Sequence, residues 1–144
     1  MARIRDSRPG EAPTLEALQH RAAATWPEYR DTLAAHPDAI AIPQRWFDEG
    51  RARVAEDDEG RPVGFAVTVA NELDSVYVDP EATERGIGRA LVEDAAARAK
   101  EAGEAALQVS AIVGSERFYA RLGFVAGGEV PSRFGRGVRM RREL

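Results

Sequence analysis

The stretch "DPEATERGIGRALVEDAAARAKEAG", residues 79–103, follows the apolar run "LDSVYV" and places two glycines directly before a helical pattern. Apolar side chains recur at helical spacing after the glycines, which predicts an amphipathic helix from about Arg89 to Ala102 that ends at Gly103. A strand, a glycine turn and a helix start therefore come in that order. The unpaired amides and the dipole of a helix start favour an anion such as phosphate at this turn.

The two glycines alone leave two interpretations open. Gly86 and Gly88 would let the backbone approach a ligand closely, because no Cβ intervenes. The alternative is that they only allow the chain to turn into a helix. Two familiar phosphate loops are excluded: a dinucleotide-binding loop needs a third glycine where Leu91 stands, and a Walker loop needs Gly-Lys-Ser/Thr, which the chain lacks.

The patterns in the rest of the chain predict a mixed α/β (α+β) fold, with helices packed on a sheet. Trp26-Pro27 separates the first two helices, because proline blocks helix continuation. A short turn at Asn71-Glu72 joins a hairpin to the next strand. We expect strands at 2–5, within 51–70 as the hairpin, and at 73–78, 106–110, 124–130 and 137–144, with further helices at 12–24, 28–35 and 115–123.

Composition limits the kind of protein and its partners. A length of 144 residues suits a single domain, 1–144, and 44% hydrophobic with 31% charged residues is a soluble globular balance. No apolar run is long enough to cross a membrane and the N-terminus does not resemble a signal peptide, so we expect a cytoplasmic protein without a membrane partner. The net charge of −4 disfavours nucleic acid. With no cysteine, and no ligand spacing around His20 and His36, we expect no metal.

Three stretches resemble the GCN5-related N-acetyltransferase (GNAT) family in sequence, order and spacing. "LDSVYVDP" resembles the family's fourth strand, "TERGIGRALV" its acetyl-CoA pyrophosphate loop, and "SERFYARLGF" its late helix. The resemblance covers about residues 51–144, which would form the acetyl-CoA-binding core. It implies a mixed, mostly antiparallel sheet of about seven strands with helices on both faces, and acetyl-CoA as co-substrate.

The resemblance also implies which residues bind the cofactor. Amides of the glycine turn would bind the CoA pyrophosphate, with charge added by Arg85 and Arg89, whose alternative role is a solvated helix start. Backbone groups of Tyr77 and Val78 would pair with the pantetheine arm as an added strand, in a splayed gap between the fourth and fifth strands. The expected cofactor-binding residues are Val76, Tyr77, Val78, Thr83, Glu84, Arg85, Gly86, Ile87, Gly88 and Arg89.

Acetyl transfer to an amine benefits from a base, an acid and a donor to the thioester oxygen. The resemblance implies Tyr119 as the general acid; the alternative is that it only packs, as we expect of Phe118. The family's base often comes from its fourth strand, at the places of Glu72 and Asp74, whose alternative role is strand-end solubility. A tight turn at 71–72 would point Glu72 to solvent, and two-residue periodicity puts Asp74 on the face of the two valines after it, which favours Asp74. The backbone amide of Val78 would polarise the carbonyl.

We expect the acceptor to be the primary amine of a small molecule, bound between the N-terminal helices and the loop joining the last two strands. Trp26, Tyr29 and Phe134 would line this pocket, although large aromatic side chains are more often part of a core. A protein or peptide amine is the alternative acceptor. A non-catalytic acyl-CoA-binding regulatory domain is a third interpretation, which Thr83 and Glu84 favour because the family's loop usually has other residues there. Relatives are often dimers, and a free strand edge would allow a homodimer.

Overall fold

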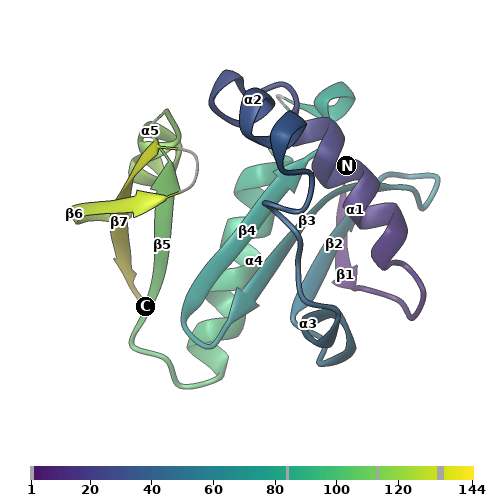
Figure 1. Ribbon diagram of the computed structural model, residues 1–144. Coiled ribbons are helices and arrows are strands. Elements are labelled where there is room, and N and C mark those ends of the chain that lie inside the picture. The colour runs from purple at the N-terminus through teal and green to yellow at the C-terminus, as the bar shows by residue number, and fades with distance from the viewer. Residues whose placement is uncertain (1, 84, 113, 133–134) are drawn as a thin grey trace.

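Seven strands form one sheet that carries helices on both faces (Figure 1). The structure, a computed structural model, describes residues 2–83, 85–112, 114–132 and 135–144. The strands are β1 (Arg3–Asp6), β2 (Ala52–Glu56), β3 (Pro62–Val69), β4 (Glu72–Val78), β5 (Ala106–Ile112), β6 (Val125–Ser132) and β7 (Gly135–Glu143). The helices are α1 (Ala12–Ala23), α2 (Pro27–Ala35), α3 (Gln44–Asp48), α4 (Ile87–Glu101) and α5 (Glu116–Arg121), with a turn of 3-10 helix at Pro80–Ala82.

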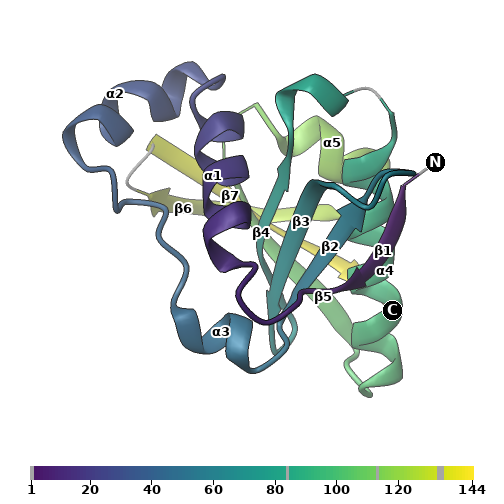
Figure 2. The same ribbon diagram turned by 90° about the vertical axis from the view of Figure 1, so that its right-hand side faces the viewer.

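The strand order is β1-β2-β3-β4-β5-β7-β6, and every neighbouring pair is antiparallel except β4 and β5. The parallel connection between these two strands runs through α4, which lies on the face of the sheet opposite α1 (Figure 2). The predicted mixed, mostly antiparallel sheet with helices on both faces is therefore confirmed.

Apolar side chains of β3 alternate between two cores, one beneath each layer of helices. Phe65 packs with Leu15 and Leu18 of α1 in the first core. Ala66, the next residue, packs in the second core with Leu91, which belongs to the apolar stripe predicted for α4. The alternation of β3 thus fixes α1 and α4 on opposite sides of the same strands.

β4 and β5 stay paired over only a short length and then separate. The paired residues are Glu72 with Gln108 and Leu73 with Val109, although both strands extend several residues beyond these pairs. Figure 1 shows the resulting division of the sheet, with β5, β6 and β7 turned away from β1 to β4. The splayed gap that the family resemblance implies is therefore present.

β4 contains a bulge at Asp74. Val67 of β3 pairs with Ser75 and Thr68 pairs with Leu73, so Asp74 has no partner across the ladder. Leu73 packs in the same core as the valines later in β4, which an unbroken two-residue alternation would not allow. We predicted that Asp74 shares a face of β4 with Val76 and Val78 because we assumed an unbroken alternation. The bulge interrupts the alternation, so this reason for the prediction no longer applies.

Other local features also differ from the prediction. The turn before β4 lies at Ala70-Asn71, one residue earlier than expected, where Ala70 has a φ of 55° and Glu72 already belongs to the strand. The predicted elements do not include α3 or the 3-10 turn. α3 is only 5 residues long, too short for a helical period to stand out. Within the described ranges, no helix is long and apolar enough to span a membrane.

Candidate active site

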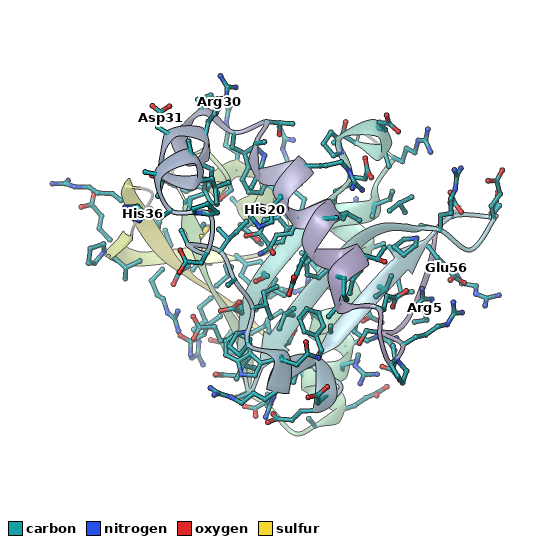
Figure 3. The ribbon with its side chains drawn as sticks, turned by 45° about the vertical axis from the view of Figure 1, so that its right-hand side comes forward. Arg5, His20, Arg30, Asp31, His36 and Glu56 are labelled. Carbon is teal, nitrogen blue, oxygen red and sulfur yellow. The ribbon has the colours of Figure 1, made fainter. Side chains whose placement is uncertain are left out.

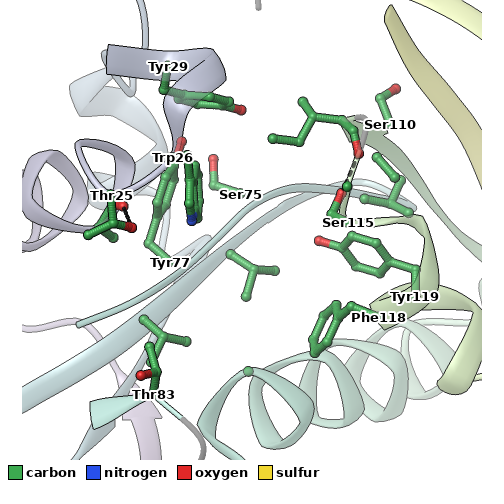
Figure 4. Close-up of a pocket in the computed structure, with 18 of the residues that line it drawn as sticks. Thr25, Trp26, Tyr29, Ser75, Tyr77, Thr83, Ser110, Ser115, Phe118 and Tyr119 are labelled. Atoms are coloured by element: carbon green, nitrogen blue, oxygen red, sulfur yellow. Dashed lines mark hydrogen bonds between the residues drawn. The ribbon is translucent and has the colours of Figure 1, made fainter. Parts of the chain in front are cut away.

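A cavity of about 450 Å³ occupies the gap between β4 and β5 (Figure 4). Its walls include residues 74–78 of β4, residues 109–112 of β5, the first turn of α4, α5, and the segment that joins α1 to α2. Figure 4 shows Thr83 at one end, Trp26 and Tyr29 at the other, and the Tyr119 hydroxyl pointing into the space between them. The cavity thus connects the predicted cofactor loop, the predicted acid and the predicted acceptor helices.

The direction of the backbone along β4 decides which of its groups face the cavity. The Asp79 amide donates to a carbonyl of β3 at 2.8 Å, and the Tyr77 carbonyl also lies on the β3 side, next to Gly64. Because successive residues of a strand point their backbone groups in opposite directions, the amides and carbonyls of Val76 and Val78 face the gap. An extended ligand can pair with these two valines. Tyr77, which we expected to supply backbone groups, contributes its ring instead.

The start of α4 presents unpaired amides next to the cavity. Gly86 is the N-cap with a φ of 73°, a left-handed conformation that favours glycine, and no side chain caps the helix. Helix geometry leaves the first amides of α4 without partners, and its first turn has no acidic residue. Gly88 has a different role, because a Cβ there would lie 3.3 Å from the Phe118 ring. Backbone conformation favours glycine at the first position, and close packing of α4 on α5 favours it at the second.

The predicted cofactor-binding residues fall into two groups. The group that lines the cavity is Val76, Tyr77, Val78, Thr83 and Gly88. The others described lie around the start of α4 outside that lining: Arg85, Gly86 and Arg89 are exposed, and Ile87 is buried in the core. Glu84 lies outside the described residues.

Tyr119 forms the middle of the cavity wall. Its ring packs edge-on against Phe118 and Phe124, with centroid separations of 5.0 and 5.5 Å. The side chain is buried, and this burial raises the pKa of the hydroxyl above its ordinary value, with a further contribution from Tyr77. The hydroxyl therefore stays protonated throughout the neutral range, so it can donate to a group in the cavity.

Trp26, Tyr29 and Tyr77 form an aromatic wall at the other end of the cavity. Trp26 stacks on Tyr77 with centroids 5.6 Å apart and meets Tyr29 edge-on at 4.9 Å. Pro27 sets this arrangement, because a residue before proline takes an extended conformation and Trp26 thereby becomes the N-cap of α2. Trp26 and Tyr29, two of the predicted acceptor residues, thus line the cavity, whereas Phe134 lies outside the described residues.

The two predicted bases occupy different environments. Asp74 is exposed, lines the cavity and accepts a hydrogen bond from the Ser75 hydroxyl at 2.6 Å. The Glu72 carboxylate lies outside the cavity lining and binds the Arg139 guanidinium at 2.7 Å, where β4 and β5 are still paired. The fold therefore brings Asp74 to the cavity and uses Glu72 to link β4 to β7.

Our prediction of the site did not include the cavity wall formed by β5 and the residues after it. Ser110, Ala111 and Ser115 line the cavity there, and the Ser115 hydroxyl donates to the Ile112 carbonyl at 2.8 Å. These residues could have been predicted from the fact that β4 and β5 are parallel neighbours in the sheet. Once two parallel strands separate, the residues that follow the last pair border the gap.

The groups that line the cavity suit an organic ligand. Across the described ranges, no three His, Cys, Asp or Glu side chains gather as a metal site would require. His20 lies on α1 and His36 directly follows α2 (Figure 3). The cavity instead offers hydroxyls, backbone groups, aromatic rings and the carboxylate of Asp74.

Most of the chain matches a known family. A family model described as acetyltransferase (GNAT) domain matches residues 18–144. The chain is 31% identical over 133 residues to a mycothiol acetyltransferase of Propionibacterium freudenreichii, across 85% of this chain and 42% of that protein. It is 30% identical over 95 residues to the peptidyl-lysine N-acetyltransferase YjaB of Salmonella typhimurium, across 66% of this chain and 65% of that protein. The chain therefore spans less than two thirds of the length of these two relatives.

Solved structures share the fold. A GCN5-related N-acetyltransferase from Rhodopseudomonas palustris superposes with a TM-score of 0.81 at 23% identity, covering 100% of this chain and 96% of that one. The PaiA N-acetyltransferase of Thermoplasma acidophilum, solved in complex with coenzyme A, has a TM-score of 0.79 at 18% identity, covering 100% and 99%. Because the family match extends over most of the sequence and the divided sheet agrees with it, the chain belongs to the GNAT acetyltransferase family.

Proposed function

We propose that this chain is an N-acetyltransferase that uses acetyl-CoA to acetylate the primary amine of a small molecule. One observation carries the proposal: a single cavity joins the start of α4 to the Tyr119 hydroxyl and the Asp74 carboxylate. The relatives named for acetylation of mycothiol and of peptidyl lysine support this class of reaction.

Groups in and beside the cavity suit two parts of acetyl-CoA, its pyrophosphate and its extended arm. The unpaired amides at the start of α4 suit the pyrophosphate, and the exposed Arg85 and Arg89 flank them. The gap-facing backbone groups of Val76 and Val78 suit an extended arm that pairs with β4 as an added strand. When bound, acetyl-CoA supplies the acetyl group as a thioester.

Asp74 is the residue placed to take a proton from the acceptor. An alkyl ammonium has a pKa near 10.4, so its deprotonation at pH 7 costs roughly 4 to 5 kcal/mol. The Asp74 carboxylate accepts this proton, directly or through a water, and later returns it to solvent. The neutral amine nitrogen then forms a bond to the acetyl carbon and loses its second proton to solvent as the amide forms. The gap-facing amide of Val78 donates to the carbonyl oxygen, on which negative charge develops.

Tyr119 is the residue placed to protonate the leaving sulfur. As the carbon–sulfur bond breaks, the Tyr119 hydroxyl donates to the thiolate and is then reprotonated from solvent. Burial raises the Tyr119 pKa, which makes the transfer more uphill than an ordinary tyrosine would face. Partial burial of the leaving sulfur beside Tyr119 would also raise the pKa of its thiol, which offsets part of this difference.

Thiol release in the presence of acetyl-CoA tests the proposal. We expect release that depends on an added primary amine, with one acetylated amine detected by mass spectrometry for each thiol. If acetyl-CoA binds but no amine or peptide promotes release, the chain is a binding domain and not an enzyme. If lysine-containing peptides react while every small amine fails, the acceptor is a protein.

A further inference from the structure

Trp26 and Tyr29 line one end of the cavity, here termed the acceptor end (Figure 4). Asp74, which also lines the cavity, lies within electrostatic reach of Tyr77, on which Trp26 stacks. We propose that the acceptor end selects a primary alkyl ammonium whose amine-bearing carbon carries no carboxylate. The ammonium lies against the aromatic wall and next to Asp74. This inference rests on the proposed function and deepens it by naming the substrate class.

The charge of the lining is the first reason. Asp74 is the single charged side chain among the described residues that line the cavity. Two arginines on neighbouring elements bind carboxylates: Arg139 binds Glu72 at 2.7 Å and also donates to the Ser110 hydroxyl at 3.0 Å, and Arg21 binds Asp79 at 2.9 Å. A cationic ligand group therefore finds a carboxylate in the cavity, whereas an anionic group finds no described guanidinium or ammonium there.

The availability of Asp74 is the second reason. Its described side-chain partner is the Ser75 hydroxyl, and no described arginine or lysine forms an ion pair with it. The bulge leaves Asp74 without a partner on β3, so the ladder does not fix it as it fixes its neighbours. Its carboxylate is thus free to pair with a cation that the ligand brings.

The aromatic wall is the third reason. Trp26 stands between Tyr77, on which it stacks, and Tyr29, which it meets edge-on. The face of an aromatic ring attracts a cation, most strongly for tryptophan, and this attraction grows when water is excluded. Trp26 is partly exposed at the cavity, whereas Tyr29 and Tyr77, which also line it, are largely buried. The wall therefore favours an ammonium attached to an apolar chain.

An α-amino acid conflicts with this arrangement. Its carboxylate lies two bonds from the amine nitrogen, so binding the ammonium at Asp74 brings a second carboxylate beside the first. Like charges at such separations repel, and no described cation in the lining offsets the repulsion. An amine without that carboxylate avoids the conflict.

Pentylamine and norleucine form a matched pair for the test, because norleucine is pentylamine with a carboxylate on the amine-bearing carbon. Their dissociation constants are measured from Trp26 fluorescence in a Trp46→Phe background, with and without saturating CoA, because Trp26 and Trp46 are the two tryptophans of the chain. We expect pentylamine to bind at least about tenfold more tightly than norleucine, from the missing repulsion. Pentanol, which lacks the charge, should bind more weakly than pentylamine.

The Asp74→Asn variant isolates the carboxylate. We expect it to weaken pentylamine binding and to reduce the preference over norleucine below about threefold, because attraction and repulsion disappear together. Asp31→Asn is the matched control: Asp31 is an exposed carboxylate on α2 outside the cavity lining (Figure 3), so its removal should leave the preference unchanged.

Three outcomes would overturn the inference: norleucine binding as tightly as pentylamine, Asp74→Asn keeping the full preference, or neither ligand changing Trp26 fluorescence. These outcomes are distinct from failure of the proposed function, which the separate thiol-release assay reports. If no amine promotes release but the preference holds, the inference stands and catalysis is wrong. If release occurs without the preference, catalysis stands and the inference is wrong.

Discussion

Two carboxylates, those of Glu56 and Asp74, lie in different regions of the molecule and have different kinds of partner. Glu56, where β1, β2 and α1 meet, is buried and binds Arg5 at 2.6 Å, with Arg3 and Arg8 also in contact (Figure 3). Asp74 borders the cavity and has the Ser75 hydroxyl as its described side-chain partner. The first carboxylate completes an ion-pair network within the chain. The second is left for a cation that comes from outside.

The difference separates residues that hold the fold from residues that act on a ligand. Changes in the network around Arg5 should lower stability and leave the activity of each folded molecule intact. Changes in the cavity should lower activity or binding and leave stability nearly intact.

Tyr119→Phe should have the largest effect. Loss of the hydroxyl removes the proton donor to the leaving sulfur, and we expect kcat for thiol release to fall by about 100-fold or more. The ring still packs against Phe118 and Phe124, so Tm should change little. Affinity for CoA, measured by calorimetry, serves as the control and should be unchanged. A variant with full activity would exclude Tyr119 from the mechanism.

Asp74→Asn should lower kcat/KM for an amine by about 10- to 30-fold near neutral pH, since it removes the proton acceptor and the anion that binds the ammonium. Glu72→Gln makes the same change in a carboxylate outside the cavity lining and should lower kcat/KM by less than about threefold. Steady-state kinetics of both variants decide between the two predicted bases. A larger loss for Glu72→Gln would reverse the assignment made from the cavity.

Gly86→Asp should weaken CoA binding by about tenfold relative to Gly86→Asn, as measured by calorimetry. Asn and Asp have nearly the same shape and both tolerate a left-handed backbone, so the two variants share any strain at the φ of 73°. They differ in the negative charge placed at the helix start. Equal affinities would mean that the pyrophosphate does not bind at α4.

Arg5→Gln should lower Tm by about 5 °C and leave kcat unchanged, because it leaves Glu11 and Glu56 facing each other without their shared guanidinium. Hydrogen bonds from Arg5 hold the pKa values of both carboxyls below their usual 4.5. A carboxyl with a lowered pKa stabilises the fold above its usual pKa, and this contribution is lost as the pH falls. The Tm of the variant should therefore fall less steeply with acid. A parallel pH dependence in both proteins would contradict this assignment.

Local patterns predicted the elements that frame the cavity. The apolar spacing around Leu91 and the two glycines before it are local features of the sequence. They were therefore sufficient to predict α4 and the turn at its N-terminus. The strand of Tyr77 and the short helix of Tyr119 likewise follow from local patterns, and the family resemblance supplied their order around the gap.

The finer geometry of the site depends on pairing between distant segments. The bulge at Asp74 arises from the register with β3, so the periodicity of β4 alone could not reveal it. The same register turns the backbone of Tyr77 toward β3 and that of Val76 toward the gap. The contribution of Ser110 requires knowledge that β5 lies parallel to β4 and then diverges from it.

The most direct test of the account is a melting curve recorded with and without acetyl-CoA. Ligand at about a hundred times its dissociation constant stabilises a protein by ~2.7 kcal/mol. For a domain of this size, we expect a rise in Tm of roughly 5 to 10 °C, and a smaller rise for Gly86→Asp at the same ligand concentration. An unchanged Tm at saturating acetyl-CoA concentrations would contradict the central claim that the gap between β4 and β5 binds this cofactor.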